Sequence, residues 1–264
     1  MKSTLFTSVF TATVFVVLNV NFSYSTTVTT NSSTGSDITG DGSSGNPYQT
    51  FHTAYTNAAE GDTILLQGTF DWTNADETGD AATTGYSLLK SLTIIGEGAG
   101  VTYIQAASSS GAADRCIFTI NDNITISDVT LRYGYNTNQG HNAGAITVMD
   151  DIRDNIVTLN NCIVEDNGID NGSSGGHYYF SGGIYLRGNT SFHPDLRLND
   201  CTFRNNSANG QAYGAGALYS MQSNDVTINR CTFNGNTGTD GSSFGVGYHN
   251  VAGAIGFFRF NTVE

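Results

Sequence analysis

The second half of the chain is built from two short sequence blocks that alternate, and this repeat constrains the fold more than any other feature. The first block is a six-residue β-type segment, Leu198-Asn-Asp-Cys-Thr-Phe203 in its clearest copy, which Asn206 follows. The second block consists of a small residue, a glycine, another small residue and an aliphatic residue. The first blocks begin at Ile126, Leu159, Leu198 and Ile228, and the second blocks are Ala143–Ile146, Ser181–Ile184, Ala215–Leu218 and Ala252–Ile255. Self-similarity over this length is typical of solenoids.

The spacing of the copies indicates which part of each repeat is fixed. The first block recurs after 33, 39 and 30 residues, and most of the scatter lies between the Asn position and the second block, where 8, 13, 8 and 15 residues intervene. A solenoid tolerates such loops because each coil contacts only its neighbours. Period-two alternation puts Leu159, Cys162 and Val164 on one face if Asn160 occupies a bend. The sequence therefore predicts an all-β protein that winds as a right-handed parallel β-helix.

Alignment of the coils also predicts two columns of stacked residues. Asparagine tolerates the left-handed conformation that a bend requires, and its side chain can hydrogen-bond the equivalent residue about 4.8 Å away on the next coil. The bend residues are Asn160, Asn199 and Asn229. The inward column comprises Val129, Cys162, Cys201 and Cys231. Side chains that point the same way from parallel strands make poor disulfide geometry, so we expect buried free thiols.

Three regions precede or form the coil. Residues 1–25 have the features of a secretory signal peptide, with Lys2 as the only positive charge before an apolar stretch. Residues 26–62 are predicted to be an N-terminal cap region, in which residues 48–59 have the spacing of a short amphipathic helix that covers the first coil. Residues 63–264 are predicted to form the parallel β-helix, with regular repeats from about residue 123. Counting on from Ile255, the next strand is expected near residues 265 to 269, so we expect a fragment of a longer protein.

Composition and charge exclude several classes of function. The chain has 32 glycines, 2 prolines and 12% charged residues, which suits many short strands joined by turns better than a helix bundle. A net charge of −13 argues against nucleic acid or an anionic membrane as the partner. No apolar run after the signal peptide is long enough to span a membrane. We therefore expect an extracellular or cell-surface protein whose mature chain has no membrane span.

The repeat resembles that of a known group of surface proteins. The FxxN motif (Phe203 to Asn206, Phe233 to Asn236) alternates with GGA[ILV]-like tetrapeptides, as in chlamydial polymorphic membrane proteins and related bacterial surface β-helices, over roughly residues 123–258. The segment from Gly40 to Thr50 is similar to the entry of pectate-lyase-like β-helix domains. The resemblance implies an extracellular or outer-membrane-associated protein, often an adhesin, and it supplies no catalytic residues.

Candidate binding residues lie in the variable loops. Because the loops leave the stack at the same corner, they are expected to line one edge of the coil, where aromatic rings interleaved with Gly, Ser and Asn suit contact with sugars or with a protein surface. The candidates are Tyr135, His177, Tyr178, Tyr179, Tyr213, Tyr248 and His249. The competing interpretation is that these rings fold back over the bases of their own loops.

No catalytic residue is predicted. The outward columns are Asp128, Asn161, Asp200, Arg230 and Arg132, Glu165, Arg204, Asn234. Their signs alternate, which favours charge balance over an acid–base pair. No cofactor is predicted either, with Ca²⁺ as the one alternative, because Asp150, Asp151 and Asp154 lie close together in a turn.

The sequence favours a non-catalytic surface scaffold that adheres to carbohydrate or to a cell-surface protein through the loops on one edge. The alternative is a polysaccharide lyase or glycoside hydrolase of the pectate-lyase-like β-helix type, in which Arg132 and Arg204 would flank a carboxylate.

Overall fold

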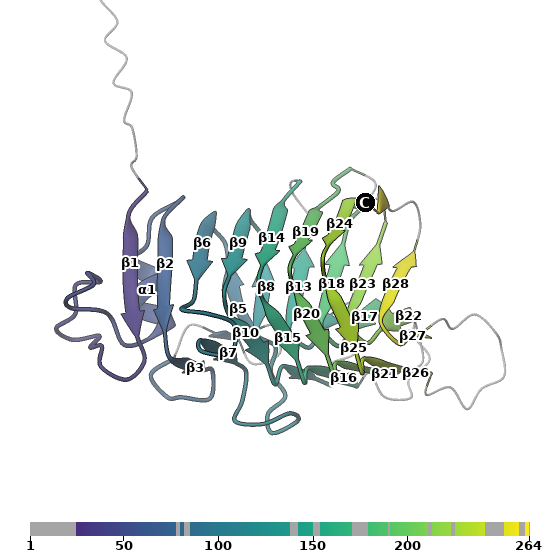
Figure 1. The fold of residues 1–264 in the computed structure, drawn as a ribbon, viewed down its shortest axis with the longest axis horizontal. Coiled ribbons are helices and arrows are strands. Elements are labelled where there is room, and N and C mark those ends of the chain that lie inside the picture. The colour runs from purple at the N-terminus through teal and green to yellow at the C-terminus, as the bar shows by residue number, and fades with distance from the viewer. Residues whose placement is uncertain are drawn as a thin grey trace, which may run out of the picture.

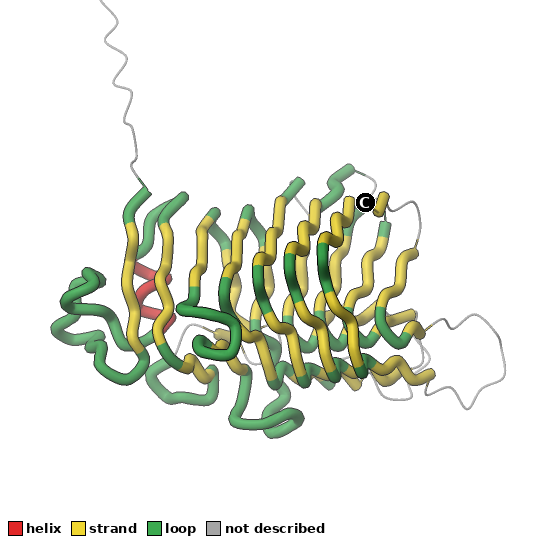
Figure 2. Tube along the Cα trace, viewed as in Figure 1, coloured by secondary structure: helices red, strands yellow, loops and turns green. Residues whose placement is uncertain are grey.

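The computed structural model confirms the predicted fold class. It describes residues 25–77, 80–81, 85–137, 142–149, 154–170, 179–189, 191–210, 213–222, 225–240, 251–258 and 262–263. Within these ranges the regular structure is almost entirely strand, wound into an elongated right-handed coil with one short helix near its N-terminal end (Figures 1 and 2). None of the described helical structure has the length and apolar character needed to cross a membrane.

The strands form five sheets, which we number in the order in which a coil visits them. The first sheet contains β1 (Thr27–Asn31), β2 (Thr63–Gln67), β6 (Leu92–Ile95), β9 (Ile124–Ser127), β14 (Ile156–Asn160), β19 (Asp195–Asn199), β24 (Asp225–Asn229) and β29 (Thr262–Val263). The second contains β3 (Thr69–Asp71), β7 (Tyr103–Gln105), β10 (Thr130–Arg132), β15 (Ile163–Glu165), β20 (Thr202–Arg204) and β25 (Thr232–Asn234).

Three further sheets complete each coil. The third contains β11 (Tyr135–Asn136), β16 (Gly168–Asp170), β21 (Ser207–Gly210) and β26 (Thr237–Asp240). The fourth contains β12 (Asn142–Ala143), β17 (Tyr179–Ser181), β22 (Tyr213–Ala215) and β27 (Val251–Ala252). The fifth contains β4 (Asp80–Ala81), β5 (Gly85–Leu88), β8 (Phe118–Ile120), β13 (Ile146–Met149), β18 (Ile184–Arg187), β23 (Leu218–Met221) and β28 (Ile255–Phe258).

Neighbouring coils pair in parallel and in the register that the repeat predicts. Leu159 pairs with Leu198 on the first sheet, and Val164 pairs with Phe203 on the second. The first and fifth sheets form opposite walls whose strands run in opposite directions (Figure 1). Only β4 and β5 pair antiparallel among the named strands of the described chain. The right-handed winding is the hand expected for crossovers between parallel strands.

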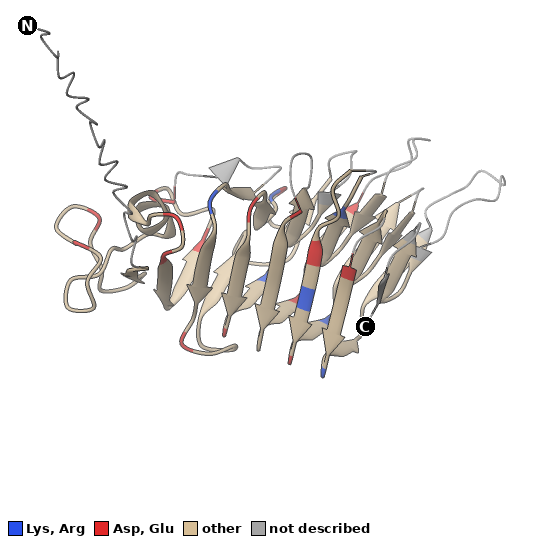
Figure 3. Ribbon diagram, turned by 90° about the horizontal axis from the view of Figure 1, so that it is seen from above, with Lys and Arg blue, Asp and Glu red and all other residues tan. Residues whose placement is uncertain are grey.

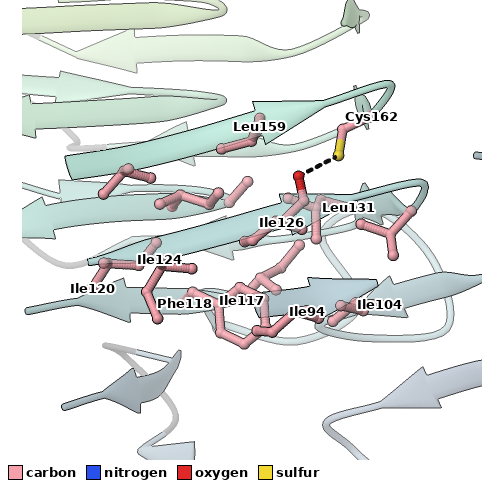
Figure 4. Packing of buried hydrophobic residues seen from close by; sticks show 14 of the residues in the cluster. Ile94, Ile104, Ile117, Phe118, Ile120, Ile124, Ile126, Leu131, Leu159 and Cys162 are labelled. Carbon is pink, nitrogen blue, oxygen red and sulfur yellow. Dashed lines mark hydrogen bonds between the residues drawn. The ribbon is translucent and has the colours of Figure 1, made fainter. Parts of the chain in front are cut away.

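The core is a stack of inward side chains, and the predicted thiol column is part of it. Cys162 and Cys201 are each 1% exposed, Cys231 is half-buried, and all are free. Figure 4 shows the inward residues of successive coils packed one behind the next, with the Cys162 Sγ 3.5 Å from the Ile126 carbonyl oxygen. The Cys162 and Cys201 thiols behave as small buried hydrophobes with a weak donor. Burial raises the pKa of Cys231, which keeps its thiol protonated at neutral pH.

The bend between the first and second sheets differs from the prediction by one residue. The residues with left-handed backbone are Asp128, Asn161, Asp200 and Arg230, with φ of 59°, 50°, 55° and 52°. Asn160 and Asn199 instead end their strands, and their side chains bond along the stack, with the Asn199 Nδ2 3.0 Å from the Asn160 Oδ1. The predicted asparagine ladder is present between Asn160 and Asn199, whereas the Asn229 Oδ1 accepts from the Arg230 Nη1 at 3.3 Å. The left-handed turn needs the next residue because the strand keeps its extended backbone through Asn160.

A second asparagine ladder lies inside the coil at the following bend. The Asn206 Nδ2 donates to the Val164 carbonyl at 2.8 Å and to the Asn236 Oδ1 at 2.9 Å. Its own Oδ1 accepts from the Asn167 Nδ2 at 3.0 Å and from the Asn167 backbone N–H at 3.2 Å. Asn167 and Asn206 are 1% and 0% exposed. The asparagine of the FxxN motif is thus a buried polar group whose hydrogen bonds are satisfied along the stack.

The edge of β1 is covered by the segment that follows it. The Thr29 and Asn31 N–H groups donate to the Gly42 and Tyr48 carbonyls at 2.7 and 2.8 Å, and the Tyr48 N–H donates to the Thr29 carbonyl at 3.1 Å. β1 comes from the predicted cap region, so the first sheet begins at Thr27. Because its backbone groups are paired, this edge is blocked against pairing with another chain.

Helix α1 (Phe51–Asn57) is the predicted capping helix and lies behind β1 and β2 (Figure 2). It is shorter than the predicted 48–59 because Thr50 and Ala58 have extended backbone. Thr50 is the N-cap and accepts a hydrogen bond from the Thr53 N–H. Phe51 is fully buried, and its ring packs edge-on against Tyr86 at a centroid distance of 5.0 Å.

Charged side chains from later coils hold both ends of this helix. The Glu77 carboxylate accepts the Phe51 N–H at 2.8 Å and the His52 N–H at 3.0 Å. At the other end, the Lys90 Nζ donates to the Tyr55 and Ala58 carbonyls, each at 2.5 Å. An acid at the N-terminus and a base at the C-terminus both complement the helix dipole. The helix is therefore fixed to the coil by backbone groups that it cannot satisfy itself.

Glu77 makes the stability of this end dependent on pH. Burial raises the pKa of Glu77 to about 7, although the two backbone donors favour its carboxylate. The native state therefore binds a proton that the unfolded chain releases near its ordinary value, so this contribution is complete at low pH and is lost as pH rises through about 7. A difference of this size corresponds to at most about 3 kcal/mol. We expect the unfolding free energy to fall between pH 5 and pH 8, and this fall to be absent in Glu77→Gln, as measured by urea unfolding at each pH. An unchanged pH profile in the variant would contradict this assignment.

Candidate functional site

The structure describes part of the predicted aromatic set. Tyr135, Tyr179 and Tyr213 lie at the ends of strands that flank the variable loops. The other predicted residues, His177, Tyr178, Tyr248 and His249, lie outside the described residues. Of the edge predicted to bind a ligand, the structure therefore describes the strand ends beside the variable loops.

The fourth sheet, which carries two of these tyrosines, is held in place by a small core of its own. Ile169, Phe180 and Ala208 pack together, and Phe180 is fully buried. Phe180 lies between Tyr179 and Ser181 on β17, so alternation turns Tyr179 to the opposite face of the strand. This small core is a second packed layer outside the main core, and it fixes the direction in which the Tyr179 side chain points.

Tyr179 and Tyr213 form a stacked pair in adjacent coils. They are register partners on β17 and β22, and their rings lie 5.3 Å apart with 18° between their planes. Behind them lie two tyrosines of the fifth sheet: Tyr219 is 6.0 Å from Tyr179, and Tyr185 is 6.4 Å from Tyr219. We call these four residues the tyrosine cluster. It forms where the outward faces of the fourth and fifth sheets meet.

Burial divides the tyrosine cluster into a floor and an accessible part. Tyr185 and Tyr219 are 0% and 3% exposed, whereas Tyr179 and Tyr213 are half-buried. Burial raises the pKa of both floor tyrosines, so their phenols stay neutral at physiological pH. The two buried tyrosines therefore form an uncharged floor beneath Tyr179 and Tyr213.

Neither floor residue belongs to the predicted aromatic set, although the sequence carries a signal for both. Tyr185 and Tyr219 directly follow the aliphatic residue of the second block, Ile184 and Leu218, which points inward. Alternation therefore requires both tyrosines to face outward from the fifth sheet. A prediction based on the variable loops alone does not include these two strand residues.

Tyr135 lies apart from the tyrosine cluster. It lies on β11 of the third sheet, in register with Gly168, and a Cβ added to Gly168 would come within 2.9 Å of its ring. Tyr135 thus covers a glycine of the next coil. The described contacts bring Tyr179 and Tyr213 together and leave Tyr135 apart.

The outward charged columns form neutralising networks. The Arg204 Nε is 2.6 Å from the Glu165 Oε2, and Arg230 forms two bonds of 2.6 Å with Asp200. Arg132 donates to the Gln105 Oε1 at 2.8 and 3.0 Å and stacks on a tyrosine ring. Figure 3 shows the charged residues scattered along the coil. These side chains act as the predicted charge balance, with their hydrogen-bonding groups engaged by neighbours.

Of the three aspartates that were candidates for calcium, only Asp154 lies within the described residues. Asp150 and Asp151 lie outside the described residues, and the Asp154 Oδ1 accepts the His193 N–H at 2.6 Å. Among the residues that the structure covers, no three His, Cys, Asp or Glu side chains are grouped to hold a metal ion.

A shallow groove of about 340 Å³ crosses the outer face of the first sheet. Its lining is mostly polar, with the hydroxyls of Ser91 and three threonines, the Asn123 amide and, at one end, Arg197. Next to it, Asp195 and Asp225 are register partners on β19 and β24, and Asp195 pairs with Arg197 at 2.5 Å. Asp195 and Asp225 are therefore outward carboxylates at equivalent positions on adjacent coils.

Comparison with known proteins gives no relative for this chain: no family model, curated protein or solved structure matches it. The fold and the side-chain geometry therefore carry the functional argument alone.

Proposed function

We propose that this protein is an extracellular, cell-surface scaffold that binds carbohydrate through the tyrosine cluster. The observation that carries the proposal is the stacked Tyr179–Tyr213 pair, half-exposed above the buried Tyr185 and Tyr219. Aromatic residues on a rigid support lose little conformational entropy on binding. The support here is a parallel sheet in which each coil fixes the next.

Carbohydrate is the ligand that best matches the accessible chemistry. Because the two rings are stacked on each other, each turns one face toward its neighbour, and both side chains remain half-exposed. The edge of an aromatic ring carries partial positive charge, and a phenol both donates and accepts hydrogen bonds. Sugar hydroxyls complement both groups without any charge. The acidic surface elsewhere disfavours anionic partners.

Replacing Tyr213 tests this site. We expect Tyr213→Ala to weaken binding of a glycan selected on an array by about tenfold or more, because truncation of a central aromatic hot spot costs about 2 kcal/mol or more. Tyr213→Phe keeps the ring and loses the hydroxyl, so we expect an intermediate loss. Tyr103→Ala on the second sheet is the matched control and should bind like the wild type. Equal binding by wild type and Tyr213→Ala, or the absence of any bound glycan, would reject the site.

A second candidate is a polysaccharide-cleaving enzyme, and one observation favours it. Asp195 and Asp225 are adjacent outward carboxylates at the end of the groove on the first sheet. Paired carboxylates of this kind perform acid–base work on glycosidic bonds. Release of unsaturated or shortened sugars from a polyuronate or neutral polysaccharide would support this candidate, whereas binding without turnover supports the scaffold.

A further inference from the structure

One outward column of the first sheet is formed almost entirely by threonine. The backbone register aligns Thr27, Thr63, Thr93, Thr125 and Thr158 on β1, β2, β6, β9 and β14 in turn. Each of these positions faces away from the core, because the strand residue beside it is buried. We call this set the threonine column.

The hydroxyls of the threonine column are available to a ligand. The four members from Thr63 to Thr158 are partly exposed, and within the described residues none of their hydroxyls has a hydrogen-bond partner. The adjacent column behaves differently, since the Asn199 and Asn160 amides bond each other at 3.0 Å. A threonine side chain offers one donor and two acceptor sites beside a methyl group.

The face around the column carries no charge. The strands β1, β2, β6, β9 and β14 contain no Asp, Glu, Lys or Arg, although the whole chain has 23 acidic and 10 basic residues. Leu65 and Ile95 face outward in the next column, and Ile156 is 39% exposed. The result is a mixed surface of methyl and hydroxyl groups.

The spacing of this surface is regular and rigid. Parallel strands lie about 4.8 Å apart, and each strand of the column is hydrogen-bonded on both sides once the β1 edge is covered. The groove of about 340 Å³ runs beside Thr93, Thr125 and Thr158. Water occupies about 30 Å³ per molecule in the liquid, so the groove accommodates a row of waters held by the hydroxyls.

We propose that the outer face of the first sheet binds the surface of ice. A flexible ligand gains nothing from the same hydroxyl and methyl groups at equal intervals over five strands, whereas a crystal surface presents its own groups at equal intervals. Ice is uncharged, it offers both donors and acceptors, and its oxygen repeat along the a-axis is close to the strand spacing. This inference does not depend on the tyrosine cluster, which lies on other sheets.

The boundary of the face supports the same assignment. The column reaches Arg197 on β19, which pairs with Asp195 at 2.5 Å, and it continues with Thr227 on β24. In the outward column beside it, Asp195 is followed by Asp225 on β24. Charged groups keep their hydration when ice excludes solutes, so a charged strand ends the contact surface. The five uncharged strands from β1 to β14 define its extent.

The test is partition of the purified chain into slowly growing ice, together with inhibition of ice recrystallisation. We expect the wild type to enter the ice and the double variant Thr93→Lys/Thr125→Lys to lose at least about tenfold in partition, which corresponds to ~1.4 kcal/mol. The matched control is Thr202→Lys/Thr232→Lys, which changes two register-paired threonines on the second sheet. This control should partition like the wild type.

A second variant protects the test against misfolding. Thr125→Val keeps the shape and the methyl groups and removes one hydroxyl, so we expect a smaller loss of partition with unchanged circular dichroism. Exclusion of the wild type from ice, or an equal loss in the second-sheet control, would overturn the proposal. Neither result bears on glycan binding, which is measured separately.

Discussion

Replacing Asn206 with leucine is expected to lower the unfolding free energy by about 4 kcal/mol or more, because the loss of a partner for each buried polar group costs about 1–3 kcal/mol. The substitution removes the donor to the Val164 carbonyl and to the Asn236 Oδ1, and it removes the acceptor for two N–H groups of Asn167. Leucine has a similar volume, so the effect comes from unpaired polar groups rather than from a cavity. Urea unfolding followed by circular dichroism measures it.

Asn199→Leu is the matched control for this ladder. It removes the bond from the Asn199 Nδ2 to the Asn160 Oδ1, but both side chains are half-exposed and water can replace the lost partner. We expect a loss within about 1 kcal/mol. If Asn206→Leu and Asn199→Leu had the same unfolding free energy, the buried ladder of Asn167, Asn206 and Asn236 would not stabilise the stack more than the half-exposed one.

Replacing Phe51 with alanine is expected to cost about 3–5 kcal/mol, the usual range for truncation of a fully buried phenylalanine. The Phe51 ring lies within 6.0 Å of Tyr55, 5.5 Å of Trp72 and 5.7 Å of Phe118, measured between ring centroids. Its loss leaves a cavity between helix α1 and the first coils. Thermal unfolding and hydrogen exchange of the N-terminal strands would report the change.

The comparison for Phe51→Ala is Phe257→Ala, the same truncation at a side chain that is 41% exposed. We expect this variant to lose much less, because the deleted ring atoms already contact water. If Phe257→Ala lowered the unfolding free energy as much as Phe51→Ala, the loss could not be assigned to the buried contacts of Phe51 between helix α1 and the first coils.

The fold was predictable because the repeat determines which residues are equivalent. Once Leu159 and Leu198 are aligned, the inward positions, the thiol column and the charge-balancing pair of Asp200 and Arg230 all follow from alternation. The placement of the left-handed residue did not follow, because a pattern of side chains does not distinguish the end of a strand from the first residue of a bend. Backbone φ places that residue at Asn161 instead of Asn160.

The site was predictable only in part. The pairing of Tyr179 with Tyr213 follows from their equivalent positions, but the distance of Tyr219 from this pair depends on how the fourth sheet folds against the fifth. That arrangement is set by Phe180 and the small core around it, which has no repeat signature of its own. The threonines of the threonine column are visible in the sequence, but their alignment is not. The short strands before residue 123 can be aligned only once the sheet pairing is known.

The hold of Lys90 on helix α1 has a further consequence for the chemistry of the surface. Lys2 and Lys90 are the two lysines of the sequence, and the Lys90 amine is engaged by two helix carbonyls and lies 4.4 Å from the Tyr55 ring centroid. An acylating reagent needs the free, unprotonated amine, so the two carbonyl bonds slow its reaction with this nitrogen until the helix end detaches. The acylation rate of Lys90 therefore reports how often the coil opens at its N-terminal end.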